Sequence, residues 1–199
     1  MAAPVPPSVA LAAATRPRRG ETANGDAWAA HWHAGVCRVA VIDGLGHGPA
    51  AEQAASVALS VLGAAPDLGP AEALAACHAA LAATRGAAMS IARIDAAGSR
   101  LTYAGVGNVE AQLWLGGRLQ RPIVHRGIVG AALPRVRALD FGLPDDWCLL
   151  MHTDGVSARF ALDALAPFTR RDLQALADAV LCGWGRPTDD ATVVVAGPA

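Results

Sequence analysis

The chain has 199 residues, a length that suits one well-buried core and is too short for two comfortable domains. Its 16 basic and 17 acidic residues give a formal net charge of −1 without a basic stripe, which argues against nucleic-acid binding. No run of about eighteen apolar residues lacks an interrupting charge, histidine, proline or glycine, so we expect no membrane span. We therefore predict a single domain over residues 1–199 that binds neither nucleic acid nor membrane.

Strands are predicted along the whole chain by short apolar runs bounded by glycine, proline or aspartate. Ala34-Gly35 is expected to turn the second strand into the third, forming a hairpin. The later strands follow one another through glycine turns, which is typical of an antiparallel meander. The expected strands are residues 8–15, 27–33, 36–42, 87–94, 100–106, 109–115, 118–124, 136–141, 147–152 and 193–196.

Three helices are predicted between these strands. Proline is tolerated at the first position of a helix, so Pro49 and Pro70 mark two helix starts, and the second helix should end near Thr84. A third amphipathic run extends from about Arg171 to Leu181. Because strands surround two contiguous helices instead of alternating with them, we predict an α+β sandwich. The helices from Pro49 and Pro70 should cover one sheet and the helix from Arg171 the other.

The four cysteines predict a reducing compartment. They stand far apart in apolar contexts, and the chain contains no CxxC pair that would suggest a zinc or redox site. The N-terminal segment contains three prolines before its first basic residue, Arg16, which is unlike an export signal. We therefore expect a cytoplasmic protein with reduced thiols at Cys37, Cys77, Cys148 and Cys182.

Four aspartates occupy similar places at strand margins, beside glycine or threonine. Taken singly, each is a common turn or helix-cap residue. Gathered at one end of a sheet, several carboxylates repel one another unless cations neutralise them, and all-oxygen ligands favour magnesium or manganese. Two such ions can share a water, lower its pKa and hold the oxygens of an in-line phosphoryl displacement. The pattern therefore predicts phosphate-ester hydrolysis, with Asp26, Asp43, Asp154 and Asp189 as the carboxylates.

These aspartates lie in motifs that resemble those of the PPM-type, metal-dependent protein serine/threonine phosphatases of the SpoIIE branch. Within that branch the chain is most similar to stand-alone stress-signalling phosphatases such as RsbX. The resemblance covers nearly the whole chain. The motifs that carry it are Gly25-Asp26, the string from Asp43 to Gly48 (DGLGHG), GVGNVE at 105–110, GIVG at 127–130, Thr153-Asp154-Gly155 and DDAT at 189–192.

The resemblance implies a two-sheet antiparallel β-sandwich flanked by helices on both faces, with two Mn or Mg ions in a cleft at one end. It implies Asp43 as the ligand that bridges both ions, and Asp190 either replaces Asp189 as a ligand or supports it. His47 is the candidate general acid. The other implied ligands are Asp26, the Gly44 carbonyl, Asp154 and Asp189, and the candidate phosphate-binding residues are Arg16, Arg18 and Arg19.

Two functions follow from these residues. The first is hydrolysis of phosphoserine or phosphothreonine on a bacterial regulatory protein, which by resemblance is a stressosome scaffold or an anti-sigma antagonist. The alternative is a catalytically silent, phosphatase-like binding module, although four retained carboxylates argue against a decayed site. A serine hydrolase is excluded because the chain contains no G-x-S-x-G motif. We expect neither a sensor domain nor an anchor beside the catalytic unit, so regulation should come through abundance or partners.

Overall fold

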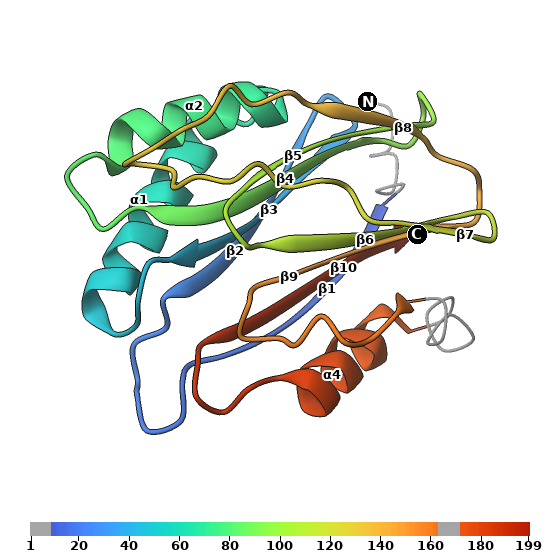
Figure 1. The fold of residues 1–199 in the computed structure, drawn as a ribbon. Coiled ribbons are helices and arrows are strands. Elements are labelled where there is room, and N and C mark those ends of the chain that lie inside the picture. The colour runs from blue at the N-terminus through green and yellow to red at the C-terminus, as the bar shows by residue number, and fades with distance from the viewer. Residues whose placement is uncertain (1–8, 163–171) are drawn as a thin grey trace, which may run out of the picture.

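Two antiparallel five-stranded sheets form the centre of the computed structural model, which describes residues 9–162 and 172–199. The sheets are stacked face to face (Figure 1). The predicted α+β fold and two-sheet sandwich are thereby confirmed. The first sheet has the order β1 (Val9–Arg16), β10 (Ala191–Pro198), β9 (Trp147–His152), β6 (Glu110–Leu115) and β7 (Arg118–Gln120). The second has the order β2 (Asp26–His33), β3 (Val36–Gly44), β4 (Ala87–Asp95), β5 (Arg100–Val106) and β8 (Leu139–Gly142).

Side chains of β3 alternate between two cores. Val39 and Val41 point between the sheets, where they join Met151 of β9 in one buried cluster. Ala40 and Ile42 point the other way, into the core beneath the helices. Because successive strand residues face opposite sides, the residue after Ile42 must again face the space between the sheets. This alternation directs Asp43 into the end of the sandwich.

The helices cover the outer faces of both sheets, as predicted (Figure 1). The first two, α1 (Pro49–Ala64) and α2 (Pro70–Leu81), pack on β2–β5, and α4 (Leu173–Trp184) packs on β1 and β10. Both α1 and α2 begin with proline, as the sequence indicates. The sequence predicts that the third helix starts near Arg171, a residue that lies outside the described part of the chain. None of the described helices has both the length and the apolar character needed to cross a bilayer.

Several element boundaries differ from the prediction, among them the following three. The helix from Pro70 ends at Leu81 rather than Thr84, because the Thr84 hydroxyl and N–H both donate to the Leu81 carbonyl and close a turn there. The strand expected at 118–124 stops at Gln120, two residues before a proline that cannot donate to a strand ladder. The strand expected at 136–141 occupies Leu139–Gly142, where it pairs with β5.

Arg38 joins the second sheet to the end of α1. Only 2% of this residue is exposed, and its guanidinium donates to the carbonyls of Leu62, Ala65 and Leu68. The last turn of α1 contains no basic residue of its own, so the side chain from β3 satisfies carbonyls that the helix leaves unpaired. Arg38 therefore fixes the α1–α2 corner on the sheet.

We expect Arg38→Met to lower the free energy of unfolding by about 3 kcal/mol, because buried carbonyl acceptors lose their donors while the side-chain stem is kept. Urea unfolding measures the change. Arg93→Met is the matched control, since Arg93 lies directly opposite Arg38 on β4 and is only partly buried. An equal loss in both variants would contradict a capping role for Arg38.

Candidate active site

Strand register brings two of the predicted aspartates face to face. In the β2–β3 ladder Asp26 lies directly opposite Asp43, so both carboxylates leave the sheet on the same side. Like charges at directly opposed positions destabilise a strand pair. Asp26 is only 7% exposed, so water can do little to stabilise the charge of its carboxylate. The pair therefore needs protons, hydrogen bonds or cations.

Asp26 receives hydrogen bonds from the other sheet. The Thr153 hydroxyl donates to Asp26 Oδ2 over 2.7 Å, and the Thr192 side chain also hydrogen-bonds to this carboxylate. Burial outweighs these bonds and, with the nearby charges of Asp190 and Asp154, raises the pKa of Asp26 to about 7. The two threonines thus orient a carboxylate whose charge remains incompletely compensated.

Asp43 lies at the centre of the acidic cluster. Burial raises its pKa to about 8, with further increases from four neighbouring carboxylates, those of Asp26, Asp154, Asp189 and Asp190. A cation at this point would replace mutual repulsion with attraction. Carboxylate oxygens are the ligands that magnesium and manganese prefer, so the residues present fit the predicted ions.

A hollow of about 240 Å³ opens beside Asp43. Three predicted carboxylates line it, those of Asp43, Asp154 and Asp189, whereas Asp26 lies across the strand pair from Asp43. Among the described residues, no three histidine, cysteine, aspartate or glutamate side chains converge closely enough to enclose an ion as they stand. The other residues of the lining are Leu45, Gly46, His47, Ala88, Asn108 and Thr188.

The adjacent aspartates at 189 and 190 have different environments. Asp190 is buried and accepts hydrogen bonds from the backbone N–H of Arg18 (2.7 Å) and of Gly25 (2.9 Å). Its carboxylate thus fastens the loop before β2 to the start of β10. Asp189 lines the hollow and accepts one short-range bond, from the backbone N–H of Asp190 at 3.0 Å. The structure thus turns Asp189, and not Asp190, toward the hollow.

Asn108 is a site residue that the sequence reasoning did not single out. Its side-chain Nδ2 donates to Asp154 Oδ2 over 2.6 Å. Burial, followed by the charge of Asp189, raises the pKa of Asp154, while Arg186 and the Asn108 hydrogen bond lower it. Only their positions in the motifs could have indicated Asn108 and the two threonines that orient Asp26. Asn108 lies in GVGNVE, Thr153 directly precedes Asp154 in TDG, and Thr192 ends the DDAT motif.

Close backbone packing shapes the loop after β3. The Gly44 N–H donates to the Gly25 carbonyl over 2.9 Å, and a Cβ on Gly44 would lie 2.2 Å from the Ala51 carbonyl oxygen. Only glycine fits there. His47 follows in the same loop, half-exposed, with its Nδ1 2.7 Å from Glu21 Oε1. The predicted general acid therefore lines the hollow with its ring oriented by a carboxylate.

None of the three arginines predicted to bind phosphate lines the hollow. The Arg16 guanidinium donates to the carbonyls of Arg186 (2.7 Å), Asp189 (3.2 Å) and Pro17 (3.3 Å), so it supports the loop that carries Asp189. Arg18 Nη1 lies 3.9 Å from Glu21. Arg19 borders a separate hollow with residues of α4 and donates its backbone N–H to Pro187.

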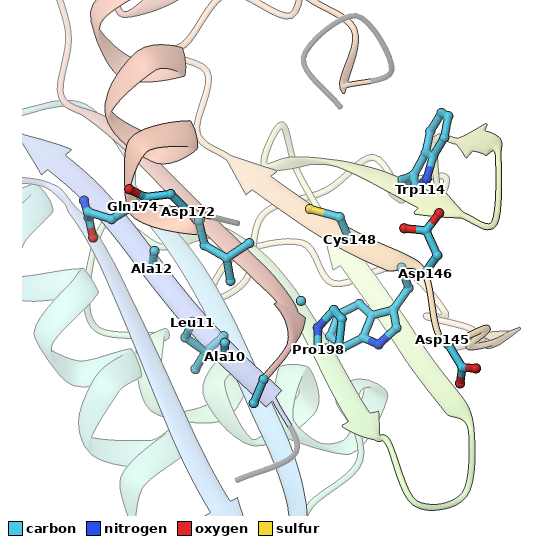
Figure 2. A pocket seen from close by; sticks show the side chains of 14 residues that line it. Ala10, Leu11, Ala12, Trp114, Asp145, Asp146, Cys148, Asp172, Gln174 and Pro198 are labelled. Carbon is cyan, nitrogen blue, oxygen red and sulfur yellow. The ribbon is translucent and has the colours of Figure 1, made fainter. Parts of the chain in front are cut away.

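A larger hollow of about 710 Å³ lies elsewhere, between the start of α4 and the strands β1, β9 and β10 (Figure 2). Its lining includes apolar side chains such as Leu11, Trp147 and Leu173. It contains none of the residues that the sequence predicted for the site. The smaller hollow beside Asp43 is lined by three of the predicted carboxylates, so it is the candidate active site.

Comparison with known proteins gives one family and many solved structures of this fold. The family model described as Stage II sporulation protein E (SpoIIE) matches residues 33–198. A chain from the structure described as "The bacterial stressosome: a modular system that has been adapted to control secondary messenger signaling" is 30% identical, with a TM-score of 0.88, covering 94% of this chain and 98% of that one. No curated protein sequence matches the chain.

Two further structures contain metal ions. RsbX in complex with magnesium is 18% identical, with a TM-score of 0.84 and coverage of 96% of each chain. The catalytic domain of the serine/threonine phosphatase PstP in complex with two manganese ions is 19% identical. Its TM-score is 0.71, and the match covers 95% of this chain and 97% of that one. At these identities the likeness shows a shared fold.

The raised pKa of Asp43 predicts how the stability of the metal-free protein depends on pH. Between its ordinary pKa of 3.8 and about 8, Asp43 is protonated in the folded state and ionised in the unfolded state. The folded state then binds more protons, so the free energy of unfolding falls as pH rises through this window. With chelator present, we expect the decrease in the free energy of unfolding over this pH window to be smaller in Asp43→Asn than in the wild type, by on the order of 2 kcal/mol.

Urea unfolding at several pH values, with chelator present, measures both slopes. The wild-type free energy of unfolding should decline toward pH 8, and the Asp43→Asn curve should be flatter. If Asp43→Asn instead unfolds the metal-free protein across the whole range, Asp43 is a structural corner residue of the strand–loop junction.

Proposed function

Because the chain belongs to the SpoIIE family and is a PPM-type phosphatase, we propose that it removes phosphate from phosphoserine or phosphothreonine on a bacterial regulatory protein. The observation that carries this proposal is the gathering of carboxylates around Asp43 from three other segments of the chain. An all-oxygen site with this excess of negative charge suits two divalent cations, Mn or Mg. The magnesium in the RsbX structure and the two manganese ions in the PstP structure support that choice.

We propose that Asp26, Asp43, Asp154, Asp189 and the Gly44 carbonyl would hold the metal ions. Asp43, Asp154 and Asp189 line the hollow. Asp190 is assigned a supporting role, because both of its oxygens accept backbone N–H groups from the 18–25 loop. When bound, two divalent cations supply Lewis-acid activation of a water and charge stabilisation for phosphoryl displacement.

The protein's own groups position these ligands and the proton donor. Asn108 fixes one oxygen of Asp154, and the Thr153 hydroxyl fixes one oxygen of Asp26. His47 lies at the hollow with its Nδ1 held by Glu21, which suits it to protonate the leaving seryl or threonyl oxygen. Among the N-terminal arginines, Arg16 is held by backbone carbonyls and Arg19 borders a separate hollow. Arg18, whose side chain has one long contact with Glu21, is therefore the candidate from that segment for binding substrate.

The proposed substrate is a phosphorylated protein of the stressosome-scaffold or anti-sigma-antagonist type, acting in the cytoplasm. The 30% identical structure comes from work described as concerning the bacterial stressosome, and this likeness supports the substrate class. The cysteines agree with a reducing compartment, since all four are free thiols in the structure.

Hydrolysis of para-nitrophenyl phosphate with and without manganese tests the activity. We expect manganese-dependent turnover in the wild type. In Asp43→Asn the turnover rate should fall more than about 100-fold, because the carboxylate that would bind the cations is removed. A manganese concentration a hundredfold above its dissociation constant should add about 2.7 kcal/mol to wild-type stability and less to the variant.

The control is Asp140→Asn, an exposed aspartate on β8 that is paired with Arg100 at 2.8 Å. It should keep wild-type turnover. A wild type that binds manganese without turning over any phosphomonoester would instead support the silent binding module.

Phosphopeptide profiling of a deletion strain tests the substrate class. Loss of the phosphatase should let serine or threonine phosphorylation accumulate on stressosome-type scaffolds or anti-sigma antagonists. Re-expression of the wild type, but not of Asp43→Asn, should reverse it. An unchanged phosphorylation level on all such proteins would sink this substrate assignment.

A further inference from the structure

Arg85 lies in a tight turn that is tied to the glycine loop of the site. The turn links α2 to β4, and the Thr84 hydroxyl donates to the Leu81 carbonyl (2.8 Å) and accepts the Gly86 N–H (3.0 Å). The Gly86 carbonyl in turn accepts the N–H of Leu45, a residue of the hollow, over 3.0 Å. The backbone on both sides of Arg85 is therefore fixed relative to the site.

The Arg85 guanidinium occupies the space that a side chain at position 46 would take. Arg85 Nη1 lies 2.7 Å from where a Cβ on Gly46 would stand. Gly46 has φ +90° and itself lines the hollow beside Asp43. Glycine at this position thus permits the loop conformation and also leaves room for the guanidinium at the rim.

Arg85 differs from Arg16 and Arg18 in having an uncommitted head group. It differs from Arg19, which borders a separate hollow, in packing against a residue that lines the site. Its side chain is exposed, and within the part of the chain that the structure describes it has no hydrogen-bond or ion-pair partner. By contrast, the Arg16 guanidinium donates to backbone carbonyls, and Arg18 lies 3.9 Å from Glu21. Arg85 is not itself a lining residue of the acidic hollow, but its free guanidinium packs against Gly46, which is, so it stands at the rim.

Charge balance indicates what this guanidinium would bind. Two divalent cations carry four positive charges, one fewer than the negative charges of Asp43 and its four neighbouring carboxylates, which leaves no net attraction for an incoming phosphate dianion. Arginine offers a planar fork of donors that matches phosphate oxygens, and a fixed positive charge at the mouth also steers anions toward it. We propose that Arg85 is the substrate-recognition residue that contacts the phosphate group of the phosphomonoester at the rim, an inference that rests on the proposed function.

Arg85→Gln tests the inference, with Arg85→Lys and Arg18→Gln beside it. The matched control is Arg118→Gln, because Arg118 is exposed and lies at the β6–β7 turn, at the opposite end of β6 from the site. We expect Arg85→Gln to raise the KM for para-nitrophenyl phosphate and the inhibition constant for inorganic phosphate about tenfold, with kcat changed much less. Arg85→Lys should restore part of the loss, and the stabilisation by manganese should stay at its wild-type size.

Constants for Arg85→Gln that equal those of Arg118→Gln would overturn the inference and leave the phosphatase assignment intact. A tenfold effect in Arg18→Gln alone would also overturn it. If the wild type shows no turnover, the proposed function fails, and a second measurement decides the role of Arg85. In manganese, inorganic phosphate should then raise the melting temperature of the wild type but not of Arg85→Gln, and an equal rise in both overturns the inference.

Discussion

The arrangement of the site depends on one unfavourable contact, the opposed carboxylates of Asp26 and Asp43 at the end of the sandwich. The alternation along β3 places Val39 and Val41 between the sheets and carries Asp43 to the same side. A register shift of one residue would turn Asp43 toward the helices and exchange the residues that fill the two cores. The packing of the sandwich therefore enforces the repulsion, and the buried pair retains a strong affinity for positive charge.

The loops around this pair are held by contacts that only glycine permits. A Cβ on Gly44 would strike the Ala51 carbonyl, and one on Gly155 would lie 1.7 Å from the Asp190 carbonyl oxygen. Asp190 in turn gathers the backbone of the 18–25 loop to the start of β10. Glycines in the motifs thus bring backbone segments together, while the neighbouring carboxylates and hydroxyls supply the chemistry. Both are needed because charged groups this close must be held rigidly to act on one substrate.

The carboxylates that line a hollow, more than its volume, distinguish the candidate active site from the other hollow. The hollow of about 240 Å³ beside Asp43 is lined by Asp43 and Asp154, whose pKa values are raised by burial and by neighbouring carboxylates. The larger hollow against α4 is lined by none of the carboxylates gathered around Asp43. Clustered, perturbed carboxylates are typical of sites that bind cations and activate water. This combination also explains why a free guanidinium at the rim has consequences for an anionic substrate.

Local features could be predicted from the sequence: strand alternation, helix starts at Pro49 and Pro70, and aspartates followed by glycine where strands end. These features depend on neighbouring residues, so periodicity and backbone preferences suffice to predict them. In contrast, the different orientations of Asp189, which faces the hollow, and Asp190, which binds the backbone, depend on tertiary contacts, because the partners of Asp190 lie 165 and 172 residues away along the chain. The same holds for Asn108, which meets Asp154 across 46 residues. Contacts between segments so far apart are set by sheet register and loop packing, which no local pattern encodes.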